Sequence, residues 1–214
     1  MNTVQVSDEL QEYLEGLIPP RDAVLARMEE EAHRESIPIV DAHEGAFLSL
    51  LVRIANSKRL LELGTATGYS GIWLLRATSG GTLTTFETNH ERALRARSNF
   101  AAAGLAKQAL VLEQDAVTGL EKLNARFDFC FIDLLNSFPS EDITRKVFDL
   151  CMERLDGGGL LIADNALRQG EVVKPKGQQA RNVAFYNQLV ARDSRLESVV
   201  VPIRDGVSVA RVKD

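Results

Sequence analysis

Acidic residues end five separate apolar runs of this 214-residue chain. They are Glu62, Glu87, Asp115, Asp133 and Asp164, and Asn165 follows the last of them directly. If the runs are parallel strands, their carboxyl ends meet along one edge of a sheet, where such sheets bind ligands. Like charges gathered on one edge are costly unless cations or hydroxyl donors lie between them. A single carboxylate could be no more than a helix N-cap, but the five together predict one ligand site.

A glycine-rich turn follows the first of these runs. Residues 59–71 read RLLELGTATGYSG, with glycines at 64, 68 and 71 ahead of a helix-like stretch. Glycine lets a loop turn sharply and lets a ligand approach bare backbone. The spacing differs from the dinucleotide fingerprint G-x-G-x-x-G, and no G-x-x-x-x-G-K-[ST] phosphate loop is present. Because Glu62 would repel a pyrophosphate, this turn favours a ligand that carries an amino group.

The acidic positions divide into two sets with different chemistry. The first set lies beside the glycine turn and consists of Glu62, Glu87 and Asp115. It suits the amine, the ribose hydroxyls and the adenine of a nucleoside ligand. The second set consists of Asp133, Asp164 and Asn165. Its hard oxygen donors predict an octahedral cation such as Mg²⁺ with open positions, and no ligand set for zinc is visible.

The elements that must position these residues can be read from hydrophobic periodicity and turn residues. The N-terminal part, residues 1–55, predicts helices over 8–16, 22–35 and 43–55 and an extended segment over 37–40. From residue 58 strands and helices alternate. The predicted strands are 59–63, 82–87, 109–113, 127–133 and 159–163, and the predicted helices are 70–77, 90–103, 117–123, 141–155 and 177–193. Glycines at 80–81, 104 and 157–159 are interpreted as helix exits.

The chain closes with two more apolar runs, 196–203 and 207–212, around Asp205-Gly206. An Asp-Gly pair between such runs is a strong hairpin signal. The sequence therefore predicts an α/β fold with a doubly wound, mostly parallel seven-stranded sheet, helices on both faces and a C-terminal antiparallel hairpin. We expect one domain over residues 1–214, in which a helical cap (1–55) precedes the α/β core (56–214).

Composition limits the classes of function. The chain is 45% hydrophobic and 26% charged, as an ordinary globular domain is, and its net charge of −5 argues against a broad nucleic-acid footprint. Cys130 and Cys151 stand in apolar contexts and are predicted to be buried free thiols. The first ten residues lack a signal peptide pattern, and no apolar run approaches the length of a membrane helix. A cytoplasmic protein without a membrane partner is therefore expected.

Four segments together resemble a known family. They are 61–70 (LELGTATGYS), 127–133 (FDFCFID), 157–165 (GGGLLIADN) and 202–207 (PIRDGV). The chain resembles the cation-dependent, S-adenosylmethionine-using O-methyltransferases of the catechol and caffeoyl-coenzyme A type, especially their small bacterial members, over roughly residues 35–212. The glycine motif alone fits many methyltransferases, whereas the Asp133 and Asp164-Asn165 set is typical of the metal-dependent branch.

The resemblance implies a Rossmann-like class I methyltransferase fold and assigns roles position by position. The methionine portion of the cofactor would be held by Glu62, Gly64 and Ser70, with Val40 packed near it, and Gly68 would also belong to the cofactor site. Glu87 would take the ribose hydroxyls, and Asp115 and Ala116 would border the adenine. The divalent cation, Mg²⁺ or another such as Mn²⁺ or Ca²⁺, would be ligated by Asp133, Asp164 and Asn165, with Asp133 also near the cofactor amine.

Two positions depart from the family pattern. Asn136 stands where the family usually has a lysine that is often interpreted as the general base, and an asparagine cannot accept a proton near pH 7. Arg168 stands where an aromatic residue is expected, so a stacking wall is lost and a cation is gained. Both are candidate catalytic residues with Asp133. With Lys174, Lys176 and Arg181, Arg168 forms a basic set that indicates either a solvated loop or recognition of an anionic acceptor or nucleic-acid phosphate.

These observations favour methylation of a hydroxyl on a small phenolic or vicinally oxygenated acceptor. The first alternative is methylation of a hydroxylated wobble uridine in transfer RNA, because the N-terminal layout resembles that of some small bacterial relatives. The second is a cofactor-binding protein that has lost methyl transfer, since Asn136 replaces the usual lysine. Family relatives are commonly dimers, so a homodimer is expected.

Overall fold

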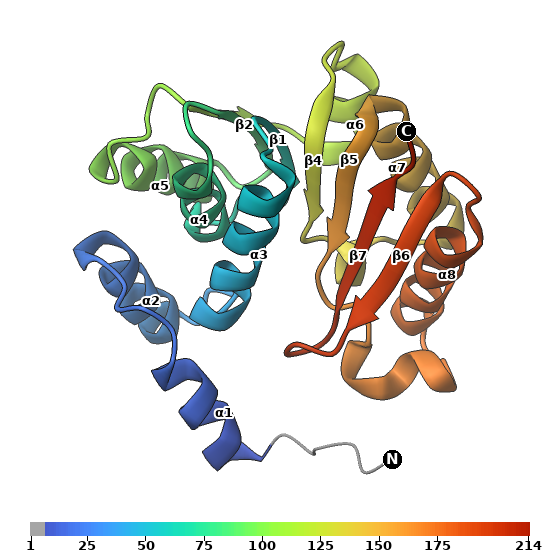
Figure 1. Cartoon of the computed structure of the whole chain (residues 1–214), viewed down its shortest axis with the longest axis horizontal. Coiled ribbons are helices and arrows are strands. Elements are labelled where there is room, and N and C mark those ends of the chain that lie inside the picture. Colours follow the sequence, from blue (N-terminus) through green and yellow to red (C-terminus); the bar gives the residue numbers. More distant parts are fainter. Residues whose placement is uncertain (1–6) are drawn as a thin grey trace.

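The computed structural model describes residues 7–214, which form a seven-stranded sheet in the order β3-β2-β1-β4-β5-β7-β6 (Figure 1). The strands are β1 (Arg59–Leu63), β2 (Thr82–Glu87), β3 (Ala109–Glu113), β4 (Phe127–Ile132), β5 (Leu155–Ala163), β6 (Leu196–Val201) and β7 (Val207–Val212). The first five strands pair in parallel, whereas β7 pairs antiparallel with β5 and β6. The predicted fold class, including the hairpin, is confirmed.

Helices cover both faces of the sheet because its central strands are apolar on both sides. Along β4, Phe129 and Phe131 belong to one core, whereas Cys130 and Ile132 belong to the other. The first core lies under α3 (Ala42–Ala55), α4 (Tyr69–Ala77) and α5 (His90–Ala102). The second lies under α6 (Ala116–Lys122), α7 (Glu141–Arg154) and α8 (Gln178–Arg192). Cys130 and Cys151 are buried and free, as expected.

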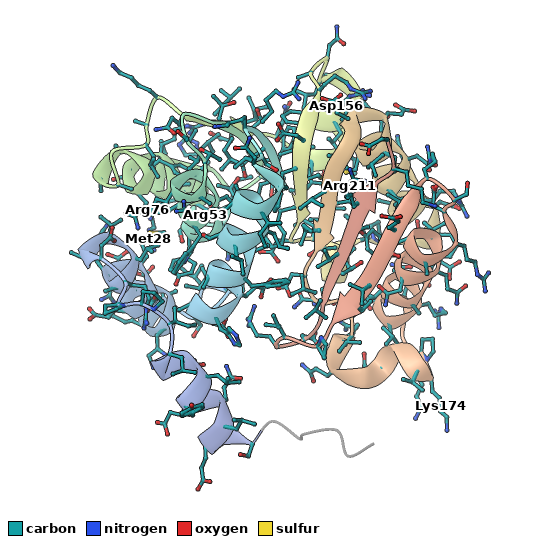
Figure 2. All side chains as sticks on the ribbon, in the orientation of Figure 1. Met28, Arg53, Arg76, Asp156, Lys174 and Arg211 are labelled. Atoms are coloured by element: carbon teal, nitrogen blue, oxygen red, sulfur yellow. The ribbon has the colours of Figure 1, made fainter. Side chains whose placement is uncertain are left out.

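The N-terminal helices α1 (Asp8–Gly16) and α2 (Ala23–Glu35) lie outside α3 (Figure 1). Met28, Arg53 and Arg76 lie near one another where α2, α3 and α4 approach (Figure 2). The Arg53 guanidinium donates to the carbonyl oxygen of Arg76 over 2.9 Å, and Arg76 pairs with Asp22, the N-cap of α2. The extended segment 37–40 then leads into α3 with Val40 buried. None of the helices over residues 7–214 combines the length and apolarity of a membrane span.

Most element boundaries agree with the sequence prediction, but the start of β5 does not. Glycines 157–159 lie inside β5 and are not a helix exit. Phe127 pairs with Leu155 while Phe129 pairs with Leu160, so extra residues of β5 form an irregularity in the ladder. Gly158, at φ 77°, supplies a backbone conformation that this irregularity needs. Two short 3₁₀ segments, η1 (Leu135–Ser137) and η2 (Arg168–Val173), were also not predicted.

The strand order places a crevice where ligands can bind. The connections run outward in opposite directions from the neighbouring strands β1 and β4. The loops that follow these two strands therefore diverge and leave a space beyond their carboxyl ends.

Candidate active site

A cavity of about 800 Å³ runs along the carboxyl edge of the parallel strands. Its wall contains a residue at or just after the carboxyl end of each of the strands β1 to β5: Gly64, Glu87, Asp115, Asp133 and Asp164. The wall also includes Val40, Ala116, Asn136 and Asn165. The structure therefore brings together in one cavity most of the residues that the sequence singled out. We call Gly64, Glu87 and Asp115 the glycine-turn end, and Asp133, Asp164 and Asn165 the aspartate end.

The glycines after β1 are required by the backbone. Gly64 has φ 105°, and a Cβ built there would lie 2.9 Å from the carbonyl oxygen of Asp133. Gly68, at φ 87°, is the N-cap of α4, and a Cβ built there would lie 3.2 Å from the ring of Phe100. A side chain at either position would be strained because the left-handed region favours glycine. The loop after β1 can therefore pass close to the loop after β4.

Glu62 is buried behind this turn rather than on the cavity wall. The hydroxyls of Ser70 and Thr85 donate to its two carboxylate oxygens, each over 2.6 Å. Burial raises the pKa of Glu62 to about 7, although these two hydrogen bonds act in the opposite direction. Ser70 also lies outside the wall. Thr85 was not singled out from the sequence, because its contact with Glu62 depends on the register in which β2 pairs with β1.

The two carboxylates of the glycine-turn end itself also have fixed hydrogen-bond donors. Glu87 accepts hydrogen bonds from the backbone N–H groups of Ala66 and Asn89, each over 2.9 Å. Asp115 caps α6 by accepting from the backbone N–H of Thr118 over 2.9 Å. These bonds hold both carboxylates in one orientation before any ligand binds.

The aspartate end differs in this respect. The backbone N–H of Asp133 donates to the carbonyl oxygen of Leu63 over 2.9 Å, but no hydrogen bond among residues 7–214 reaches its carboxylate. Burial, together with the charges of Asp164 and Glu44, raises the pKa of Asp133 well above its usual range. Asp164 is 3% exposed and accepts from the neighbouring backbone N–H of Asn165, over 2.6 Å, and from one guanidinium. Asn165 itself adopts a left-handed conformation, at φ 59°.

That guanidinium belongs to Arg204, which was not predicted to take part. Its Nη1 lies 2.5 Å from Glu44 Oε2 and 3.5 Å from Asp164 Oδ2, while its Nε lies 3.2 Å from Asp41 Oδ2. Glu44 is fully buried at the start of α3, and burial raises its pKa to about 8. A charged residue in an otherwise apolar helix was a signal for Glu44. Arg204 gave no local signal, since its partners are up to 160 positions away.

The basic residues expected at the mouth separate in the structure. Arg168 Nη1 donates to Asn136 Oδ1 over 2.8 Å, although Arg168 is not on the cavity wall. Lys174 projects from the far end of η2 (Figure 2). Arg181 bonds to the carbonyl oxygen of Lys176 and to Gln178. Only Arg168 therefore contacts a residue of the cavity.

The donor set of the aspartate end has the chemistry of a hard cation site. Within residues 7–214, no group of three or more histidine, cysteine, aspartate or glutamate side chains is arranged to hold a metal ion. The expected set has only two carboxylates, and its third member is an amide. Asp133, Asp164 and Glu44 nevertheless influence one another electrostatically, and Arg204 partly offsets their charge. A divalent cation would fit this uncompensated charge.

Comparisons with known proteins agree with the geometry. The profile of a family described as O-methyltransferase matches residues 20–213. A protein of Niastella koreensis named catechol O-methyltransferase is 27% identical over 226 residues, which cover 98% of this chain and 99% of that protein. The solved structure of an O-methyltransferase from Bacillus cereus in complex with SAH is 28% identical, with a TM-score of 0.85 over 96% of this chain and 97% of the other. The O-methyltransferase TomG from Streptomyces achromogenes, solved with SAM, is 26% identical, with a TM-score of 0.82 over 96% of each chain.

Proposed function

The chain belongs to the O-methyltransferase family, and from this premise we propose that it methylates a hydroxyl of a small phenolic or catechol-like acceptor with the help of a divalent cation. S-Adenosylmethionine is the methyl donor, as the solved relatives with SAM or SAH support. One observation carries the proposal: a single cavity contains both the glycine-turn end and the aspartate end.

The glycine-turn end supports the assignment of the cofactor. Glu87, held by two backbone N–H groups, keeps its carboxylate directed for ribose hydroxyls. Asp115 and Ala116 border the adenine, and Val40 closes the wall. Glu62 lies behind Gly64, and the hydroxyls of Ser70 and Thr85 donate to its carboxylate oxygens. Because Gly64 has no side chain, the negative charge of Glu62 can attract the amine of the cofactor across the backbone. The cofactor supplies an electrophilic methyl group on its sulfonium.

The aspartate end supports the assignment of the cation. Asp133, Asp164 and Asn165 would hold it, and the acceptor's two adjacent oxygens would complete its coordination. When bound, the cation lowers the pKa of the acceptor hydroxyl and fixes its orientation. Asp133 belongs to both ends, since Gly64 approaches its backbone closely and its carboxylate lies at the aspartate end. The chain thereby positions acceptor and methyl donor side by side, which lowers the entropic part of the barrier.

The experiment is a methyl-transfer assay with S-adenosylmethionine and catechol, in Mg²⁺ and after treatment with EDTA. We expect methylated catechol in Mg²⁺, loss of product in EDTA and recovery when Mg²⁺ is added. Unchanged turnover in EDTA would contradict the cation assignment. Cofactor binding without transfer to any phenolic acceptor would favour the alternative of a binding protein.

Transfer-RNA binding and the homodimer stay predictions. Binding of transfer RNA is checked by mobility shift at two salt concentrations, where a steep salt dependence would favour the nucleic-acid alternative. All four basic residues considered for that role (Arg168, Lys174, Lys176 and Arg181) lie outside the cavity wall. The homodimer is checked by light scattering.

A further inference from the structure

Arg168 fixes the orientation of the Asn136 side chain. Its Nη1 lies 2.8 Å from Asn136 Oδ1. A guanidinium can only donate hydrogen bonds, so the atom of the asparagine that faces it must be the oxygen. The amide nitrogen, Nδ2, is therefore directed away from Arg168.

The amide nitrogen of Asn136, Nδ2, lies at the cavity with its hydrogen-bond donors unused by the described residues. Asn136 lies on the cavity wall within η1, whereas Arg168 lies behind it. No hydrogen bond from Nδ2 to another side chain or carbonyl is found among residues 7–214. The amide N–H groups are thus left to meet a ligand at the aspartate end.

The backbone around Arg168 is held in place from the hairpin turn. Arg168 and Gln169 both have positive φ, 43° and 51°. The backbone N–H of Leu167 donates to the carbonyl oxygen of Asp205 over 2.8 Å, and that of Gln169 donates to Asp205 Oδ1 over 2.5 Å. Such a conformation persists only where its surroundings enforce it. The donor direction of Asn136 is therefore set before an acceptor binds.

Among residues 7–214, no side chain at the aspartate end is suited to remove the acceptor proton. Asp133 and Asp164 are assigned to the cation, and Arg204 is itself a cation. Lys146, also on the cavity wall, lies 2.6 Å from Glu121 and sits with the residues of α6 and α7. The asparagine amide neither accepts a proton nor stabilises a neutral hydroxyl better than an ionised one.

We propose that this site selects acceptors whose hydroxyl ionises near neutral pH, such as phenols conjugated to a nitro or carbonyl group or enols, and that Asn136 Nδ2 donates to the ionised oxygen. This inference rests on the proposed function and names its substrate class. The hydroxyl loses its proton to solvent before transfer. Its oxygen then forms the bond to the methyl carbon while the carbon–sulfur bond breaks, and the electron pair stays on the sulfur, which becomes a neutral thioether. Arg168 acts as a positioning residue.

The test uses 4-nitrocatechol, whose ionisation is visible in its absorbance spectrum, in the presence of Mg²⁺ and S-adenosylhomocysteine. We expect the wild type to bind the ionised form of the probe. The variant Asn136→Asp is nearly isosteric, but its carboxylate can only accept hydrogen bonds. It should therefore raise the pKa of the bound probe by about one unit or more. Arg168→Met should shift it in the same direction, because the asparagine is then free to turn. The exposed Lys174→Met serves as the control and should leave the bound pKa unchanged.

A second measurement begins with the wild type alone. Across substituted catechols at neutral pH, kcat/KM of the wild type should rise with the acidity of the hydroxyl, by about tenfold per unit of pKa at most. Asn136→Lys should flatten this dependence and move catechol turnover to lower pH. Equal bound pKa values in wild type and Asn136→Asp, or a flat series in the wild type, would overturn the inference and leave the proposed function standing. No methylation of any catechol would overturn the proposed function itself.

Discussion

At the glycine-turn end of the cavity each carboxylate has its own donors, whereas the aspartate end has one carboxylate without a donor among the described residues and one that shares its guanidinium. Glu87 accepts from two backbone N–H groups, and Asp115 from another. Asp133 has no donor among the described residues, and Asp164 shares Arg204 with Glu44. The first arrangement is complete without a ligand. The second leaves charge that an added cation would offset, so the two ends should respond differently to mutation, pH and metal.

The largest expected effect separates the two ends directly. Asp164→Asn should lower methyl transfer about 1,000-fold, because Lewis-acid activation by a cation contributes several kcal/mol, while S-adenosylhomocysteine affinity stays near that of the wild type. Turnover and calorimetric titration measure the two quantities.

The matched control is Asp156→Asn in β5, the strand that Asp164 directly follows. Asp156 lies at the start of β5, at the end of the strand opposite Asp164, and pairs with Arg59 and Arg126, each over 2.7 Å. The Asp156→Asn variant should leave methyl transfer unchanged. An equal loss of cofactor affinity in Asp164→Asn would contradict the separation of the two ends.

The next effect concerns pH and the glycine-turn end. The pKa of Glu62 is raised from 4.5 to about 7, so the folded state binds its proton more tightly than the unfolded chain does. Its contribution to the free energy of unfolding therefore falls as pH rises from 4.5 to about 7, by about 3 kcal/mol in all. Glu62→Gln should remove this fall, which urea unfolding of the ligand-free protein at pH 5 and pH 8 would detect.

Cofactor binding should change in the opposite direction over the same pH range. Because an ionised Glu62 favours the cofactor amine, affinity for S-adenosylmethionine should rise with pH in the wild type and stay flat in Glu62→Gln. Glu153→Gln, with a side chain 63% exposed, is the control for both measurements. A pH-dependent difference in Glu153→Gln equal to that in Glu62→Gln would rule out burial as the cause.

A smaller effect tests the contact that joins the two ends. Gly64→Ala should lower the free energy of unfolding by about 2 kcal/mol. The added Cβ would be strained by the positive φ and would also lie too close to the carbonyl oxygen of Asp133. Gly80→Ala provides the comparison, because Gly80 has φ 73° and nothing within 4 Å of its added Cβ. If thermal unfolding shows the same loss for both, the contact with Asp133 contributes nothing beyond backbone strain.

The smallest effect concerns the guanidinium at the aspartate end. Arg204→Gln should raise the affinity for Mn²⁺ about tenfold, because it removes a positive charge 3.5 Å from Asp164. Calorimetric titration measures this affinity without turnover. Arg211→Gln, which removes an exposed arginine paired with Asp214, should leave it unchanged. Weaker Mn²⁺ binding in Arg204→Gln would mean that Arg204 mainly organises the site.

The sequence predicted the sheet and the residues at its strand ends because both depend on local signals. Apolar runs identify strands buried on both faces, and their carboxyl ends must share one edge. Asp133 and Asp164 were found in this way, although 31 positions separate them in the chain.

What the sequence did not reveal depends on tertiary contacts. Arg204 reaches Glu44 across 160 positions, and Thr85 reaches Glu62 between neighbouring strands. Neither contact follows from periodicity. The early start of β5 was missed because three consecutive glycines are as typical of a helix exit as of an irregular strand.

The turn at residues 202–206 reaches both the N-terminal cap and the segment after β5. Arg204 binds Glu44 in α3, and the carbonyl oxygens of Asp205 and Gly206 accept from Leu167 and Ala166, each over 2.8 Å. The glycine-turn end, by contrast, draws on residues up to Thr118. A truncation or a mispaired last hairpin would therefore remove contacts from the aspartate end, while the hydrogen-bond donors to Glu87 and Asp115 would all remain in the chain.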